Sequence, residues 1–185
     1  RFPLYVLIEK IMAPFERVDE SWAIYGTTGY RFASVVNGLF VDRAASRKFT
    51  RIYHSFIGDR SSWESIARRS KRQVLRSELA AELSVLTNQL ARIAHADRRT
   101  RDYPFDTLRQ ALLEVIAHFP VYRTYIDGRV SATDKRYIDW AVSQARRSSR
   151  ETDAAIFEFI RATLLAAAGT GVTPADRLAL AFVLR

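Results

Sequence analysis

The sequence contains no cysteine and only three histidines in 185 residues. The lack of thiols excludes a disulfide scaffold and any metal site built from thiolates. The histidines, His54, His95 and His118, stand far apart and lack the spacing with which helical histidines share a metal ion. No metal site is therefore predicted.

Long apolar runs are also missing. No stretch approaches the roughly 18 consecutive apolar residues that mark a transmembrane helix. No charged and then apolar leader with a small-residue cleavage site is visible. The chain begins at Arg1, contains a single methionine at Met12, and ends within an apolar pattern. We therefore expect a piece of a longer protein, with a cytoplasmic location and no membrane partner.

Apolar residues make up 48% of the chain and aromatic residues 12%, which favours a folded domain with a core over a disordered segment. The net charge is +9, from 29 basic and 20 acidic residues. A basic excess of this kind can indicate a nucleic-acid partner. A neutral ligand needs no such charge.

Apolar residues recur at helical spacing through most of the chain. One short helix is predicted over 32–40 and a second over 49–57, with Gly58 as its C-cap. Ser61 and Glu64 have the spacing of a capping box, which predicts the start of the next helix.

The clearest helix is predicted from about Trp63 to Ala96. A stripe of aliphatic residues alternates steps of four and three residues along its second half. The stripe lasts only about two heptads, so we expect internal packing rather than a partner coiled coil. It consists of Leu79, Leu83, Leu86, Leu90 and Ile93.

Further helices are bounded by clear start and stop signals. Pro104 in the first turn opens one helix, and Pro120 ends it. Ser131 with Asp134 opens another, and Thr173 is the N-cap of the last. The prediction is a mainly α fold with two or three short strands at most.

One strand is predicted from the β-branched and aromatic run Tyr5–Ile11, which carries Glu9 and Lys10 where the apolar pattern ends. Charged groups at a strand end are what a barrel or a parallel sheet offers its substrate. A solvated salt-bridge pair at the end of a core strand is the alternative interpretation.

Several motifs carry a family resemblance. Ile8–Ile11 reads Ile-Glu-Lys-Ile, and Trp22–Tyr30 ends in Gly-Thr-Thr-Gly-Tyr. Phe119–Tyr125 reads Phe-Pro-Val-Tyr-Arg-Thr-Tyr, and Ala181–Arg185 ends the chain with a further apolar run. In this order, over essentially the whole chain, they resemble maltooligosyltrehalose synthases, intramolecular transglucosylases of the α-amylase superfamily.

The resemblance implies a mainly α chain, a helical insertion with a short strand segment from a (β/α)8 catalytic barrel. Residues 1–31 are then barrel strand and loop, 32–119 the insertion, and 120–185 a strand-like Tyr-Arg-Thr-Tyr run with helices returning to the barrel. Away from the other barrel strands, the segment Phe2–Ile11 is expected to lack parallel partners.

The implied reaction converts the reducing-end α-1,4 link of a maltooligosaccharide into an α,α-1,1 link, without a cofactor. Glu9 takes the place of the family's general acid/base. A glycosidic bond breaks as its leaving oxygen is protonated, which needs a carboxyl that stays protonated near neutral pH. The nucleophilic aspartate and a second assisting aspartate belong to barrel strands outside this chain, so the chain alone is expected to be inactive.

Aromatic faces stack on sugar rings, and cationic side chains donate to sugar hydroxyls. For each of these side chains, core packing or a surface ion pair is the alternative. One departure from the family matters, because Arg31 stands where an aspartate usually follows Gly-Thr-Thr-Gly-Tyr. The predicted substrate-binding residues are Lys10, Trp22, Tyr30, Tyr122, Arg123 and Tyr125.

Two other functions stay open. A non-catalytic glucan-binding relative is compatible with Arg31. A basic helical nucleic-acid-binding module is the second, but no recognition motif is present and the charges are mixed. We read the basic cluster of the long helix as a solvated face and predict no nucleic-acid partner. This cluster consists of Arg68, Arg69, Lys71, Arg72 and Arg76.

Overall fold

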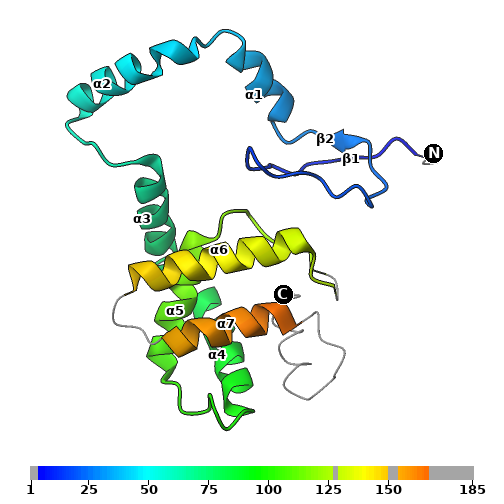
Figure 1. Ribbon diagram of the computed structural model, residues 1–185, viewed down its shortest axis with the longest axis vertical. Helices are drawn as coiled ribbons and strands as arrows, with labels where there is room; N and C mark the ends of the chain where they lie inside the picture. Colours follow the sequence, from blue (N-terminus) through cyan, green and yellow to red (C-terminus); the bar gives the residue numbers. More distant parts are fainter. Residues whose placement is uncertain (1–3, 127–128, 150–153, 167–185) are drawn as a thin grey trace. The chain divides into compact units, whose positions relative to one another are not determined.

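The computed structural model describes residues 4–126, 129–149 and 154–166 (Figure 1). The described residues are mainly helical with one two-stranded sheet, which confirms the predicted fold class. The chain divides into two compact units, Arg1–Ser61 and Ser62–Arg185. Each unit is described separately below.

The first unit contains two short strands followed by helices. Its elements are β1 (Leu7–Ile8), β2 (Gly26–Thr27), α1 (Arg31–Gly38), the 3-10 helix η1 (Arg43–Ala45) and α2 (Ser46–Ile57). The strands are parallel, with Leu7 opposite Gly26 and Ile8 opposite Thr27. The expectation that this strand segment lacks a parallel partner is therefore wrong at one edge, because β2 comes from the same chain.

Helices α1 and α2 are amphipathic, but neither contains a buried residue. Gly58 ends α2 with a left-handed φ of 69°, as predicted for a glycine C-cap. The large apolar side chains of both helices are exposed, and Phe56 reaches 89%. These apolar faces therefore contribute no core to the first unit.

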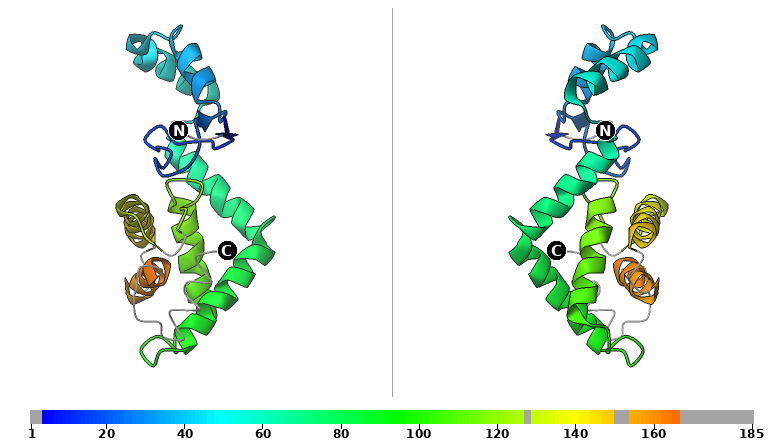
Figure 2. Two further views of the ribbon diagram at one scale, coloured as in Figure 1. Left: turned by 90° about the vertical axis from the view of Figure 1, so that its right-hand side faces the viewer. Right: turned by 90° about the vertical axis from the view of Figure 1, so that its left-hand side faces the viewer.

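The second unit is a bundle of five helices in the described residues. They are α3 (Trp63–Arg76), α4 (Ala80–His95), α5 (Phe105–His118), α6 (Ala132–Ser148) and α7 (Ala154–Leu165). Helix α5 contacts the other four, with α6 and α7 on one side and α3 and α4 on the other (Figure 2). Its Leu108 and Leu113 lie in the core with Leu83 and Leu90 of α4 and Phe157 of α7.

The predicted long helix from Trp63 to Ala96 is wrong, because it is two helices. Ser77 leaves helical geometry at φ −109° and ψ −82°, and its hydroxyl donates to the carbonyl of Gln73. The start is also shifted by one residue, since Ser62 rather than Ser61 accepts the backbone N–H of Ser65. The aliphatic stripe packs internally as expected, with Leu83, Leu90 and Ile93 buried.

Other boundaries agree with the sequence patterns. Helix α5 follows Pro104 and ends before Pro120, and Ser131 with Asp134 forms a complete capping box at α6. The strand-like Tyr122–Tyr125 run is assigned to no strand among the described residues. The predicted helix start at Thr173 and the motif Ala181–Arg185 lie outside the described residues. The boundaries at 31/32 and 119/120 stay predictions.

Candidate functional site

Two of the sequence motifs meet at the carboxyl ends of β1 and β2. The backbone N–H of Tyr25 donates to the carbonyl of Val6 at 2.9 Å, and Thr28 donates to Ile8 at 2.8 Å. Glu9 therefore follows the end of β1 directly, beside the Thr28 that follows β2. In open α/β sheets, ligands bind beyond this end of parallel strands.

Beyond the last paired residues of β1 and β2, the side chain of Thr27 makes hydrogen bonds in place of the backbone pairing between the strands. Its hydroxyl accepts the backbone N–H groups of Lys10 and Gly29 and donates to the carbonyl of Lys10, at 3.0 Å in each case. A hydroxyl has one donor and two acceptor positions, so its hydrogen-bonding capacity is full. Thr27 thus fixes the backbone on the carboxyl side of Glu9.

Gly29 allows the backbone after β2 to lie directly against the backbone of Lys10. A β-carbon at this residue lies 2.1 Å from the carbonyl oxygen of Lys10, far inside contact distance. Tyr30 follows with a left-handed φ of 64° and leads into α1. The second glycine of the Gly-Thr-Thr-Gly motif therefore has a steric reason, and the motif positions the backbone beside Glu9.

Lys10 is engaged in a buried ion pair. Its Nζ donates to Oε1 of Glu16 at 2.5 Å, and the two side chains are 8% and 6% exposed. The other carboxylate oxygen of Glu16 accepts the backbone N–H of Ala13 at 2.9 Å. The partner of Lys10 is thus Glu16, six residues along the loop, whereas the carboxylate of Glu9 is exposed.

Of the other predicted site residues of the first unit, Trp22 lies on the loop between β1 and β2, and Tyr30 follows β2 as the N-cap of α1. Trp22 is half-buried in a turn where Asp19 accepts both the backbone N–H and the hydroxyl of Ser21. The hydrogen bonds from Ser21 hold the pKa of Asp19 below its usual value. Tyr30 is exposed.

The remaining predicted residues lie on one segment between α5 and α6 in the second unit, flanked by buried Val121 and Ile126. Tyr122 is 90% exposed. The guanidinium carbon of Arg123 lies 5.1 Å from the ring centre of Tyr125, a cation–π distance. This segment therefore offers an exposed aromatic ring and a second ring with a cation beside it.

Comparison with solved structures links both units to one enzyme. The structure of maltooligosyltrehalose synthase from Arthrobacter ramosus matches 97% of this chain, with a TM-score of 0.72 and 26% sequence identity. A point mutant of that enzyme matches with a TM-score of 0.71 at the same identity and coverage of this chain. This chain is structurally similar to a segment of maltooligosyltrehalose synthase.

The resemblance that the sequence motifs indicated is therefore confirmed. The chain spans about a fifth of the length of the synthase structure, 20% of its chain. No protein-family model and no curated protein sequence matches. In the part of the chain that the structure describes, no helix is both long and apolar enough to cross a membrane.

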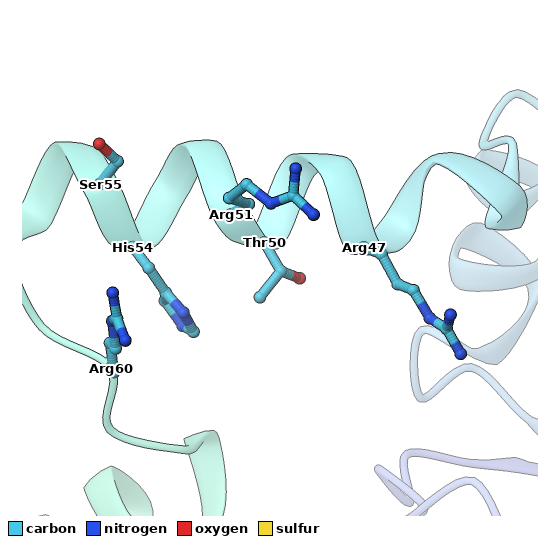
Figure 3. Close-up of a pocket in the computed structure, with 6 residues that line it drawn as sticks. All are labelled: Arg47, Thr50, Arg51, His54, Ser55 and Arg60. Atoms are coloured by element: carbon cyan, nitrogen blue, oxygen red, sulfur yellow. The ribbon is translucent and has the colours of Figure 1, made fainter.

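A second polar feature, which the synthase motifs do not include, lies on α2. A recess of about 560 Å³ follows one side of this helix and the loop after it. Figure 3 shows Arg60 from the loop directed toward His54 of the helix. Apart from half-buried His54, the lining residues are exposed. They are Arg47, Thr50, Arg51, His54, Ser55 and Arg60.

A third feature is centred on Glu114 of α5, a buried carboxylate that is 5% exposed. Arg72 of α3 grips its carboxylate with Nε at 2.9 Å from Oε1 and Nη2 at 2.7 Å from Oε2. Nδ1 of His118 lies 2.9 Å from the carbonyl oxygen of Glu114. Burial lowers the pKa of His118, against the opposing effect of Glu114, and the charges of Arg72 and Arg68 lower it further.

The interpretation of the α3 basic cluster as a solvated face is wrong for Arg72, whereas Lys71 is exposed as expected. Arg72 is committed to Glu114, and the Nζ of Lys71 donates to the carbonyl of Phe119 at 3.0 Å. Burial lowers the pKa of Lys71. One feature of the sequence could have indicated this site. Glu114 interrupts the apolar run Leu112–Ile116, which predicts a carboxylate on the core face of the helix.

Proposed function

We propose that this chain is part of an enzyme that converts the reducing-end α-1,4 link of a maltooligosaccharide into an α,α-1,1 link. One observation carries the proposal. The Ile-Glu-Lys-Ile and Gly-Thr-Thr-Gly motifs are joined through Thr27 and Lys10 at the carboxyl ends of two parallel strands, in a chain that matches the synthase over 97% of its length.

Glu9 is the proposed general acid and base. Its carboxyl gives a proton to the oxygen of the α-1,4 link as the bond between that oxygen and the anomeric carbon breaks. The anomeric carbon is held meanwhile by a carboxylate from the remainder of the enzyme. Glu9 then takes the proton from the anomeric hydroxyl of the released glucose as this oxygen attacks, so the net reaction is an isomerisation.

The first unit supports Glu9 through its backbone rather than through a side-chain partner. Thr27 and Gly29 fix the backbone at Lys10, and the buried pair of Lys10 with Glu16 orders the next residues. Lys10 thus acts as a positioning residue. The walls that keep a catalytic carboxyl protonated belong to the remainder of the enzyme.

Sugar contacts are proposed for Trp22 and Tyr30 in the first unit, and for Tyr122, Arg123 and Tyr125 in the second. Aromatic rings stack on pyranose faces, and the guanidinium of Arg123 can donate hydrogen bonds to sugar hydroxyls. Arg31, exposed at the first turn of α1, replaces a carboxylate by a cation. A cation cannot do the work of a carboxylate, so we assign Arg31 no role in sugar binding.

The test is Glu9→Gln in the whole enzyme, with Glu20→Gln as the matched control on the exposed part of the same loop. Loss of the general acid is expected to reduce formation of the α,α-1,1 link by about 10²–10⁴-fold. Glucan affinity is expected to stay the same, and Glu20→Gln to stay active. Turnover of Glu9→Gln within a factor of two of the parent contradicts the assignment. A parent that binds the glucan but forms no product supports the non-catalytic relative instead.

A further inference from the structure

Three helices of the second unit surround a recess of about 470 Å³ beside the pair of Arg72 and Glu114. Helix α3 contributes one face, α5 contributes His118, and α6 contributes the opposite residues. This α3/α5/α6 recess is lined by Ser65, Arg68, Arg69, Arg72, His118, Gln144, Arg147 and Ser148.

The charge of the recess is strongly one-sided. It contains four arginines and a histidine, and the adjoining carboxylate is that of Glu114. Arg72 grips this carboxylate with both Nε and Nη2, so the negative charge is already neutralised. In the described ranges, no salt bridge engages Arg68, Arg69 or Arg147. A backbone hydrogen bond lowers the pKa of the nearby Glu64 carboxyl most, and the charge of Arg68 helps to lower it, although no salt bridge joins Arg68 and Glu64 in the described residues. Three guanidinium groups therefore line the recess without a salt bridge of their own.

The buried polar network gives this recess a fixed base. Glu114 also accepts from Gln110 at 3.3 Å and from the hydroxyl of Ser148 at 3.4 Å, which ties α5 to α6. A carbonyl can only accept, so Nδ1 of His118 carries the hydrogen shared with Glu114. Nε2 is then the ring nitrogen left to gain a proton and become a donor.

We propose that the α3/α5/α6 recess binds the phosphate group of a small ligand. A phosphate monoester carries close to two negative charges and three acceptor oxygens, which match three guanidinium groups better than the two oxygens of a carboxylate do. The donors converge from three helices on one recess, whereas a duplex needs a row of contacts along its backbone. The site is independent of the glucan chemistry proposed for Glu9.

Protonation of His118 is linked to this binding. Burial and the charges of Arg72 and Arg68 of α3 lower the pKa of His118, and Glu114 of α5 opposes them. Arg147 of α6 lines the same recess. A bound phosphate adds negative charge and an acceptor for Nε2, so it raises the pKa of His118. By reciprocity, the affinity for the phosphate dianion increases as the pH falls through that pKa.

The test uses inorganic phosphate, titrated into the protein at low ionic strength and followed by calorimetry and by the imidazole NMR signals of His118. Arg147→Gln removes a recess guanidinium, and Arg146→Gln removes the same charge from the neighbouring residue outside the recess. One charge-assisted hydrogen bond corresponds to about 10-fold or more in affinity, so Arg147→Gln is expected to weaken binding at least that much. Arg146→Gln is expected to change it less than about 2-fold, through screened charge alone.

Arg69→Gln, an exposed change on α3, is the second variant should Arg147→Gln unfold the bundle. A titration with a sugar phosphate distinguishes the free ion from a phosphate monoester, because only the ester gains affinity from contacts beyond the phosphate. Equal weakening by Arg146→Gln and Arg147→Gln, tighter binding of duplex DNA than of phosphate, or an unchanged His118 pKa at saturating phosphate each overturns the proposal.

Discussion

The hydroxyl of Thr27 holds the backbone of Lys10 at both of its polar groups, accepting from its N–H and donating to its carbonyl at 3.0 Å each. The contact spans seventeen residues of sequence. It joins the two motifs that carry the resemblance to the synthase, and it lies one residue beyond the proposed catalytic Glu9.

Thr27→Val keeps the shape of the side chain and removes its hydrogen bonds to Lys10 and Gly29. The two N–H groups and the carbonyl then lose their hydrogen bonds to Thr27, at a cost of about 1–3 kcal/mol for each buried group left unsatisfied. We expect the amides of Lys10 and Gly29 to exchange faster with deuterium. Thr27→Ser, which keeps the hydroxyl, is expected to restore slow exchange. Equal exchange in all three proteins contradicts the role of this side chain.

Gly29→Ala places a methyl group against the carbonyl of Lys10, which has to move. We expect separation of the two motif backbones and loss of the Thr27 hydrogen bonds, seen as chemical-shift changes across Ile8–Ile11. Gly38→Ala is the control, because open space surrounds its β-carbon position and alanine favours a helix by up to about 1 kcal/mol. A Gly29→Ala protein with unchanged Ile8–Ile11 shifts speaks against the steric argument.

Local patterns predicted the helices better than the junctions between them. The periodicity and caps of α5 and α6 agree with the structure because both signals are local in sequence. The helix breaks at Ser77 without a glycine or a proline, and the apolar pattern of the sequence runs through this residue without interruption. It reflects the packing of α3 and α4 against α5, which sequence spacing does not encode.

The candidate site shows the same division. The motifs identified Glu9, Lys10 and the Gly-Thr-Thr-Gly loop. They did not identify Glu16 as the partner of Lys10, since that pairing depends on how the loop returns. The pair of Arg72 and Glu114 joins residues 42 positions apart and was missed for the same reason.

Lys10→Met leaves the carboxylate of Glu16 buried without its partner. Removing one member of a buried pair costs about 3–5 kcal/mol, so we expect rapid proteolysis within the loop between β1 and β2. The double change Lys10→Met with Glu16→Leu is expected to recover most of the resistance, because no charge is then left buried. Lys135→Met breaks the exposed pair with Asp139 and is expected to cost only about 0.3–0.5 kcal/mol. Similar proteolysis of all three variants refutes the distinction.

His118 makes the stability of the second unit depend on pH. Burial lowers its pKa in the folded protein, so below the unfolded value of about 6.5 the unfolded chain binds a proton that the folded chain resists. Unfolding is then favoured as the pH falls, and the free energy of unfolding rises with pH up to that value. Urea unfolding at pH 5.5 and 7.5 measures the difference, and His118→Gln is expected to reduce it. An equal or larger difference in the variant argues against His118 as the cause.

Two phenylalanines differ in burial, one in the core of the bundle and one on the apolar face of α2. Phe157 of α7 is 0% exposed and lies in the core cluster, whereas Phe56 of α2 is 89% exposed. Phe157→Ala leaves a cavity and is expected to lower the free energy of unfolding by about 3–5 kcal/mol. Phe56→Ala is expected to change it by less than about 0.5 kcal/mol, because almost no apolar surface returns to water. Chemical unfolding of both variants measures these values, and a cost above 2 kcal/mol for Phe56→Ala, beyond the usual surface range, shows that this face is covered in the intact protein.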